Sequence, residues 1–286
     1  MSGPQHPYLK VPAEWEVVEQ SGPGPFTTLM RWRRPDGAVV TWRSRHHRKA
    51  PVAVVSRWWW APNEIGWWIG VLFAVGASCF LAASTPMFAD VFGTSVQNVT
   101  YFVGSIFFTS AATCQFIQTQ SVGTDPTMPH VRRSGLRARF EARRIDSWAA
   151  VIQLAGTLLF NRSTWFAMWD QADAARLERL VWTPDAVGSV CFLVASWLAW
   201  AEVCNGASRW QPRTIGWWVA AVNLAGSIAF GVSAVGAVIV SGGEMLSDAL
   251  ATAGTLVGAV CFLAGGVLLL PELGSPAVPA TAPAKR

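Results

Sequence analysis

The chain has 286 residues, of which 52% are hydrophobic and only 14% are charged, and its net charge is +5. Soluble domains of this size carry about a quarter of their residues as charges. The composition therefore excludes an ordinary soluble domain and predicts a chain that meets both lipid and water.

Residues 1–60 are polar and basic and form the predicted N-terminal cytoplasmic region. Two runs of β-prone residues flank Pro35, Asp36 and Gly37, so a β-hairpin is expected near residues 26–45. A basic run follows it. Bases beside a cytoplasmic membrane surface attract anionic lipid headgroups with about 1 kcal/mol each. The bases expected to bind headgroups, here and in a second basic segment, are Arg43, Arg45, Arg48, Lys49, Arg132, Arg133, Arg137 and Arg139.

Apolar segments of membrane-spanning length follow at residues 65–88, 97–118, 147–168, 184–203, 215–240 and 245–270. Each is long enough to cross a hydrocarbon core of about 30 Å as a helix. A chain crossing lipid must satisfy its backbone groups internally, which makes helices the expected form. We therefore predict an all-α membrane protein with six transmembrane helices and a small N-terminal cytoplasmic β-hairpin region.

The basic residues predict the orientation of these spans. All but three of the 22 Lys and Arg residues lie before the first span, in the second or fourth connection, or in the tail. The exceptions are Arg162, Arg176 and Arg179, which fall on the opposite side. Because cytoplasmic loops carry the excess of Lys and Arg, both termini are expected in the cytoplasm and the protein in the plasma membrane. Residues 273–286 are rich in Pro and Ala and are expected to be disordered.

The sequence also repeats itself. Residues 60–68 (WAPNEIGWW) return as residues 210–218 (WQPRTIGWW), with a weaker copy at residues 145–148 (IDSW). Every span contains a Gly followed four residues later by Phe, which is more often than 25 Gly and 15 Phe in 286 residues would give by chance. These features predict three tandem two-helix hairpins at about residues 61–118, 145–203 and 213–271.

The Gly/Phe pair has a physical role in lipid. Glycine and its small neighbour allow two helix backbones to approach closely, and Phe one turn later lies on nearly the same face. We interpret the pair as a helix-packing motif. The alternative is a passage through the membrane, which requires that the six motifs face one central axis. The motif residues are Gly76, Phe80, Gly104, Phe108, Gly156, Phe160, Gly188, Phe192, Gly226, Phe230, Gly258 and Phe262.

Hairpin units with a Gly-Ser-x-x-Phe helix resemble the YrhK-like bacterial membrane proteins, an uncharacterised family whose unit is about one hairpin. The resemblance covers about residues 60–272 as three degenerate copies. The chain departs from the short family form by its triplication and its added N-terminal region. The resemblance implies a location in a bacterial inner membrane and supplies no catalytic residue.

Few polar residues are available for function inside the spans. The candidate polar pathway consists of Gln115, Gln153, Asn161, Asn223, Glu202 and Glu272. The sequence has no nucleophile–base pattern, phosphate-binding loop or metal-ligand cluster, so no catalytic residue, metal or cofactor is expected. We expect a non-catalytic membrane module that acts by association with itself or a partner. The alternative is a channel or carrier for a small solute through the six-helix bundle.

The expected partners are the lipid bilayer, its anionic headgroups, and a second copy or another membrane protein. Nucleic-acid binding is not favoured, because Trp32 and Trp42 alone make a small stacking platform. Gln153 and Asn223 occupy the same place in the second and third predicted hairpins and distinguish the two functions. Side chains that face a hydrated cavity favour transport, and side chains that bond across a dry helix interface favour the module.

Overall fold

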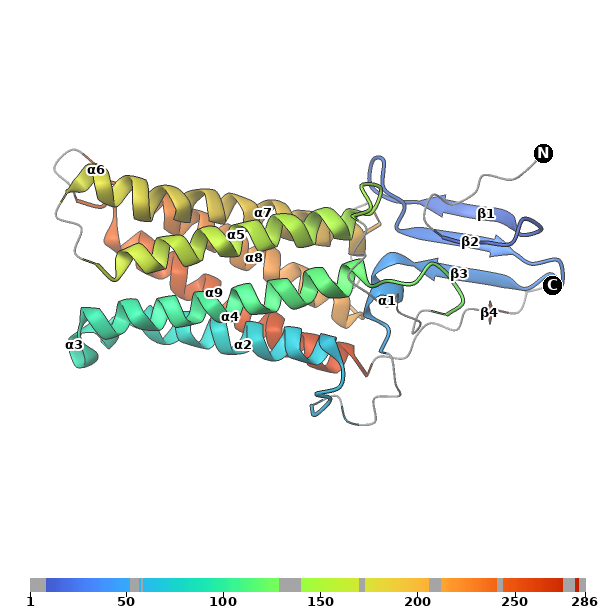
Figure 1. Ribbon diagram of the computed structural model, residues 1–286, viewed down its shortest axis with the longest axis horizontal. Coiled ribbons are helices and arrows are strands. Elements are labelled where there is room, and N and C mark those ends of the chain that lie inside the picture. The colour runs from blue at the N-terminus through green and yellow to red at the C-terminus, as the bar shows by residue number, and fades with distance from the viewer. Residues whose placement is uncertain are drawn as a thin grey trace.

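The computed structural model describes residues 9–51, 57, 59–128, 140–169, 173–205, 212–240 and 244–274, and the backbone of residues 281–282. A bundle of long helices and a small antiparallel sheet stand end to end, as Figure 1 shows. The short helix α1 (Ser44–Lys49) lies at their junction.

The described bundle consists of six long helices: α2 (Ile65–Ala83), α4 (Thr94–Gln120), α5 (Ile145–Ala167), α7 (Thr183–Val203), α8 (Ile215–Gly236) and α9 (Asp248–Glu272). All but α5 belong to the 5 described segments that are long and apolar enough to cross a membrane. α5 has 23 residues but is more polar, because it carries Asp146, Gln153 and Arg162. The prediction of a mostly helical, multi-pass membrane protein is thus confirmed by five candidate spans, and a span at α5 stays a prediction.

Two helices end earlier than the sequence predicts. α2 ends at Ala83, and Pro86 precedes the separate short helix α3 (Phe88–Phe92). Proline lacks a backbone N–H and cannot continue a helix without breaking a hydrogen bond. α8 ends at Gly236, after which Ile239 forms an isolated β-bridge with Met245. At the start of α7, α6 (Ala174–Leu177) and the π-helical turn η1 (Glu178–Trp182) lead directly into the long helix.

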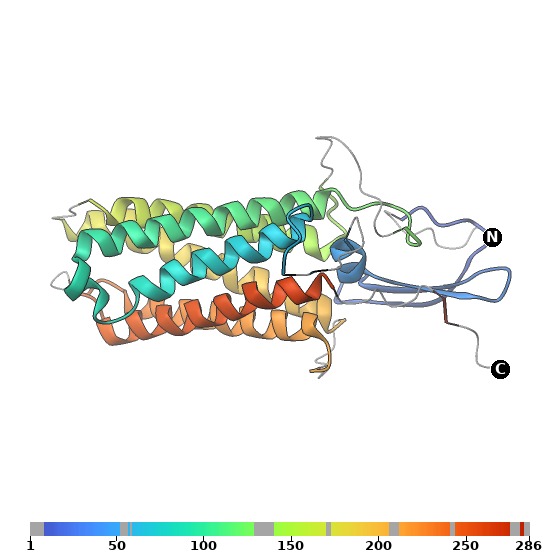
Figure 2. The ribbon, with the colours of Figure 1, turned by 90° about the horizontal axis from the view of Figure 1, so that it is seen from below.

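The six long helices form a closed ring. α2 packs against α4, α5 against α7, and α8 against α9. The ring closes through further contacts of α4 with α5, α7 with α8, and α9 with α2. Figures 1 and 2 show these helices running side by side along the bundle. A closed ring of helices has an interior, which side chains either fill or leave as a cavity.

The motif glycines lie at close approaches between paired helices. A Cβ atom added to Gly76 in α2 would lie 3.0 Å from the carbonyl oxygen of Gly104 in α4. The corresponding distance is 3.2 Å in the α5–α7 and α8–α9 pairs, between Gly188 and Gly156 and between Gly258 and Gly226. A larger residue at these positions would meet the backbone of the neighbouring helix, so close approach depends on glycine.

The sheet contains β1 (Glu16–Ser21), β2 (Leu29–Arg33) and β3 (Val39–Arg43), with the backbone of β4 (Thr281–Ala282) paired to β3. β2 and β3 lie where the sequence predicts a hairpin, and Gly37 in their turn has a positive φ of 83°. Sequence analysis does not predict β1, whose residues alternate between exposed and half-buried. β1 pairs with β2 and gains cross-strand ion pairs such as that of Arg31 with Glu19.

The sheet has a small core of its own and faces one end of the helix ring. That core consists of Leu9, Met30, Trp32, Val40 and Trp42. Because β4 pairs with β3, residues near both termini lie at the same end of the ring. Of the predicted disordered tail, only residues 273–274 and 281–282 fall within the described residues.

Candidate functional site

Helix α1 lies at the end of the helix ring that faces the sheet, which we call the inner end (Figure 1). It follows β3 without a gap, and its residues Ser44, His47 and Arg48 are buried. α1 contacts α4 and α7, and His47 Nε2 lies 3.1 Å from the carbonyl oxygen of Gly123. The basic run therefore packs into the inner end of the ring.

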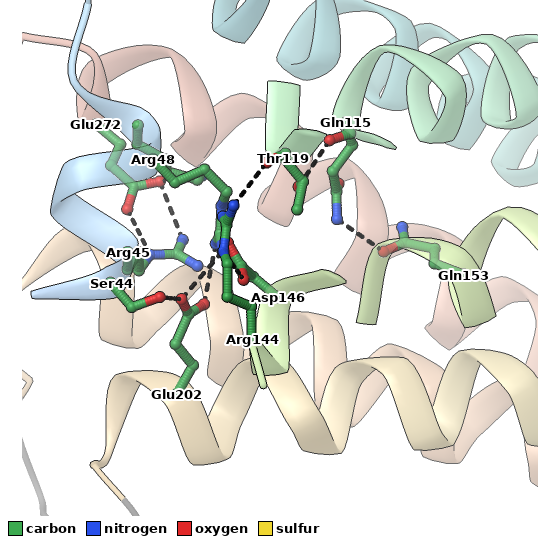
Figure 3. A network of polar contacts seen from close by, with 11 residues as sticks. Ser44, Arg45, Arg48, Gln115, Thr119, Arg144, Asp146, Gln153, Glu202 and Glu272 are labelled. Carbon is green, nitrogen blue, oxygen red and sulfur yellow. Dashed lines mark hydrogen bonds and ion pairs between the residues drawn. The ribbon is translucent and has the colours of Figure 1, made fainter. Parts of the chain in front are cut away.

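Arg48 is at the centre of a group of ion pairs (Figure 3). It donates to the two carboxylate oxygens of Glu202 over 3.0 and 2.9 Å, and its Nη1 lies 2.8 Å from Oδ2 of Asp146. The Arg48 side chain is 8% exposed, and those of both acids are 2% exposed. Burial disfavours the charged guanidinium, but Glu202 and Asp146 outweigh burial, and the pKa of Arg48 rises above its ordinary value. Arg48 is therefore permanently charged.

Glu272 binds two bases of α1 at once. Arg45 donates from Nε to Oε1 over 2.8 Å and from Nη2 to Oε2 over 3.1 Å. Lys49 Nζ donates to Oε2 over 2.6 Å. Burial and the neighbouring Arg45 lower the pKa of Lys49 to about 7, although Glu272 acts in the opposite direction. Two cations thus share one carboxylate.

Arg144 and Ser44 complete the polar contacts at the inner end. Arg144 pairs with Asp146 and donates from Nη1 to the carbonyl oxygen of Thr119 over 3.0 Å. The Ser44 hydroxyl donates to Glu202 over 2.6 Å. Each carboxylate comes from a different helix: α5, α7 or α9. We call the charged residues the ionic cluster, and its members are Arg45, Arg48, Lys49, Arg144, Asp146, Glu202 and Glu272.

A cavity of about 90 Å³ extends from the ionic cluster between the long helices. Its lining includes four amide side chains: Gln115, Gln118, Gln153 and Asn223. One water molecule needs roughly 10–15 Å³ of such volume. The cavity therefore accommodates several water molecules or one small solute.

Two of these amides were the residues expected to distinguish transport from packing. Gln153 and Asn223 both line the cavity. Gln153 Oε1 accepts a bond of 3.1 Å from Gln115 Nε2, which links α5 to α4 (Figure 3). Asn223 Nδ2 donates to the carbonyl oxygen of Val219 in its own helix over 2.8 Å. Gln153 thus both faces the cavity and bonds across a helix interface, whereas Asn223 faces the cavity and bonds within its own helix.

The motif phenylalanines fill the ring interior at the other end of the cavity. One from each of α2, α5 and α8 forms a triangle with ring centroids 6.4, 6.0 and 5.8 Å apart. The other three motif phenylalanines also meet: the ring centroid of Phe262 in α9 lies 5.9 Å from that of Phe108 in α4 and 6.0 Å from that of Phe192 in α7. We call these residues the phenylalanine layer: Phe80, Phe108, Phe160, Phe192, Phe230 and Phe262. They converge on the interior of the ring, as the passage alternative requires.

Carboxylates inside the ring bind three of the bases that were predicted to contact lipid headgroups: Arg45, Arg48 and Lys49. Sequence alone could not reveal this, since Glu202 and Glu272 are far away along the chain. Arg43 is exposed, and its role in headgroup binding stays a prediction. The remaining bases of that set, Arg132, Arg133, Arg137 and Arg139, lie outside the described residues.

Most of the predicted polar pathway comes together in the cavity. The members that line it are Gln115, Gln153, Asn223, Glu202 and Glu272. Asn161 is not in that lining; it follows Phe160 in α5, and its Oδ1 atom is buried. The pathway prediction therefore does not extend past the phenylalanine layer.

Sequence reasoning missed Arg144, Asp146 and Gln118 as site residues. A signal existed for two of them in the predicted repeats. Asp146 follows Ile145 at a position where the other two copies have glycine, and Gln118 stands where they have glutamate. Departures from a repeat thus mark the residues that line the inner end. For Arg144 the sequence carries no comparable signal.

Comparison with known proteins finds no matching protein-family model, no similar curated protein and no similar solved structure. The resemblance to the YrhK-like family therefore stays a prediction.

Proposed function

We propose that this chain is a channel or carrier for a small polar solute, in a closed state, with the cavity as its solute-binding site. The observation that carries the proposal is the amide-lined cavity inside a closed helix ring, between the ionic cluster and the phenylalanine layer. Neutral amides bind polar solutes through both donors and acceptors. Polar groups facing a cavity within a membrane bundle are typical of solute paths.

The proposal includes six membrane spans in three tandem hairpins, with α5 as the third span. α5 packs between α4 and α7 as a full member of the ring, which supports its crossing the membrane with them. The close glycine approaches recur in the three helix pairs, which supports the tandem arrangement. Exposed apolar side chains on the long helices, among them Val190, Ile228 and Val257, are suited to lipid contact.

The sheet and α1 lie on the cytoplasmic side of a bacterial inner membrane in this proposal. The distribution of Lys and Arg supports that orientation. Tryptophans at both ends of the ring support the position of the bilayer, because indole groups settle at membrane interfaces. Exposed examples are Trp59, Trp60, Trp68, Trp148 and Trp218 near the inner end and Trp165 and Trp169 near the opposite end.

Passage requires that the cavity opens at both ends, at the ionic cluster and at the phenylalanine layer, which we call its two closures. At the inner end α1 must move, because its bases occupy the space between the carboxylates of α5, α7 and α9. At the phenylalanine layer the rings must rotate or the helices must separate. Hydrophobic constrictions of this kind close channels by excluding water.

The non-catalytic module that the sequence favours is the second candidate. The observation in its favour is the network of ion pairs that fixes α1 to three helices and makes the inner end a rigid unit. Such a module acts by association with a second copy or a membrane partner and needs no open state.

Solute flux decides between the two candidates. The purified full chain is reconstituted in liposomes, and swelling is followed by light scattering with urea, glycerol, sodium formate and sodium chloride. We expect flux of at least one solute above protein-free liposomes, and its loss in Asn223→Leu. Thr113→Leu is the matched control, because Thr113 is exposed on the outside of α4. No flux with any solute would support the module, and equal flux in both variants would contradict passage through the cavity.

A further inference from the structure

The charges of the ionic cluster do not balance. Arg48 and Arg144 pair with two acids, Asp146 and Glu202. Arg45 and Lys49 both pair with a single acid, Glu272. Among the described residues the cluster therefore contains one more cation than anions when Lys49 is protonated. The excess lies at the edge of the cavity, since Arg45 and Lys49 both line it.

The segments outside the described residues offer few acidic groups. Those segments contain a single acidic residue, Asp170. It follows Trp169 in sequence, after the end of α5 that is opposite to Asp146 and the cluster. A bound anion would supply this counter-charge, and deprotonation of Lys49 would remove the need for it.

We propose that the cavity beside Arg45 and Lys49 binds a small monovalent anion, a halide or a short-chain carboxylate. This inference rests on the proposed function, because it identifies the solute class of the same cavity. One excess cation is balanced by one negative charge, which favours a monoanion over a dianion such as hydrogen phosphate. A volume of about 90 Å³ admits such an ion with a few water molecules.

Hydrogen-bond donors are available for the anion. Arg45 uses Nε and Nη2 for Glu272, and its guanidinium carries five N–H donors in all. Lys49 has three donors, of which one reaches Glu272. The amides of Gln115 and Asn223 each have a second N–H beyond the bond described above. Two charged and two neutral donor groups thus line one cavity.

Titration of Lys49 fits this arrangement. The charged groups that face it are Arg45 and Arg48 of α1 and Glu272 of α9. Burial and the two guanidinium groups lower the pKa of Lys49 to about 7, against Glu272. A bound anion would oppose that effect and raise the pKa, so anion binding and protonation of Lys49 favour each other. Anion affinity should therefore fall as the pH rises from 6 to 8.

The test uses the full chain in detergent, with thermal unfolding followed by tryptophan fluorescence. Sodium chloride, sodium formate and sodium gluconate are titrated at constant ionic strength. We expect the midpoint temperature of unfolding to rise saturably with chloride, formate or both, and the comparison of these two salts distinguishes a halide from a carboxylate ligand. Gluconate is too large for the cavity and should give no saturable rise. Equal responses to all three salts would contradict the site.

Charge variants localise the effect. Arg45→Gln/Lys49→Gln should abolish the saturable rise, whereas Arg31→Gln/Arg33→Gln, with the same change of charge on the exposed sheet, should leave it intact. If the first variant does not fold, Glu272→Gln decides. Removing the competing carboxylate should tighten anion binding by about tenfold or more. Unchanged or weaker binding in Glu272→Gln would overturn the proposal.

Lys49→Arg tests the coupling to protonation. It should bind the anion with little pH dependence between 6 and 8, because arginine stays charged. An affinity that falls with pH as steeply as in the wild type would contradict the role of Lys49. Saturable anion binding without solute flux would reject the proposed channel or carrier and support the anion site. Flux of a neutral solute without any specific anion effect would reject the anion site and support the channel or carrier.

Discussion

The two closures of the cavity are built in different ways. The phenylalanine layer takes the same motif residue from each of the six long helices, and its members contact one another through rings of one kind. The ionic cluster takes acids from three helices and bases from α1 and the start of α5. An apolar closure can thus be encoded by repetition, whereas an ionic closure depends on unlike residues that meet only in the folded chain.

The two closures should also respond differently to substitution. In the phenylalanine layer an apolar replacement loses some contacts and leaves the others in place. In the ionic cluster the removal of Arg48 takes a base away from two buried carboxylates, which is costly in a low-dielectric environment.

Arg48→Met should have the largest effect on stability. It leaves Glu202 and Asp146, whose side chains are 2% exposed, without their shared base. We expect the free energy of unfolding in detergent to fall by about 3–5 kcal/mol. Arg31→Met is the control, because its pair with Glu19 is exposed and should contribute less than about 1 kcal/mol. Equal effects in the two variants would remove the distinction between the closures.

Gly258→Ala tests the close approach of α9 to α8. The added Cβ would lie 2.3 Å from a ring carbon of Phe230 and 3.2 Å from the carbonyl oxygen of Gly226, so the pair must shift. We expect a loss of about 1–3 kcal/mol in unfolding free energy. Gly231→Ala, in α8, meets no atom within 4 Å and should instead gain about 0.5–1 kcal/mol. Changes of the same sign in both variants would contradict the close packing.

Phe160→Leu tests the tolerance of the phenylalanine layer. The Phe160 ring contacts Phe80, Phe192 and Phe230 at centroid distances of 6.4, 5.0 and 5.8 Å. Leucine retains an apolar side chain, so we expect a loss of about 1 kcal/mol. If the layer is a barrier, solute flux in liposomes should rise above the wild type. A loss as large as that in Arg48→Met, or a flux that falls, would contradict this prediction.

The pH dependence of Lys49 should be the most gradual effect, because it is spread over several pH units. Its pKa is lowered to about 7 from the ordinary value of 10.5, so the unfolded chain holds the proton to higher pH than the folded one. This group therefore makes the unfolding free energy rise between about pH 7 and 10.5. Lys49→Met should flatten that rise, whereas Lys10→Met, at an exposed position, should not. The measured quantity is the unfolding free energy of each variant minus that of the wild type, followed as a function of pH.

Sequence could predict the parts of this molecule that repeat or follow local patterns. The Gly/Phe spacing identified the residues that meet in the ring, and the turn at Gly37 lies between strands where a hairpin was expected. The direction of α1 could not be predicted. Nothing local distinguishes bases that face lipid headgroups from bases such as Arg48 that bind acids on distant helices. The strand β1 was also missed, because its exposed, charged pattern is stabilised only by pairing with β2.

The central claim is that a water-filled cavity lies inside the helix ring between the two closures. Its most direct test is the reactivity of Gln153→Cys in membrane vesicles, with the native cysteines replaced and a small, charged, water-soluble thiol reagent. Thr113→Cys, on the outside of α4, serves as the lipid-facing reference. We predict that Gln153→Cys is modified and Thr113→Cys is not. A cysteine at position 153 as unreactive as the one at position 113 would contradict it.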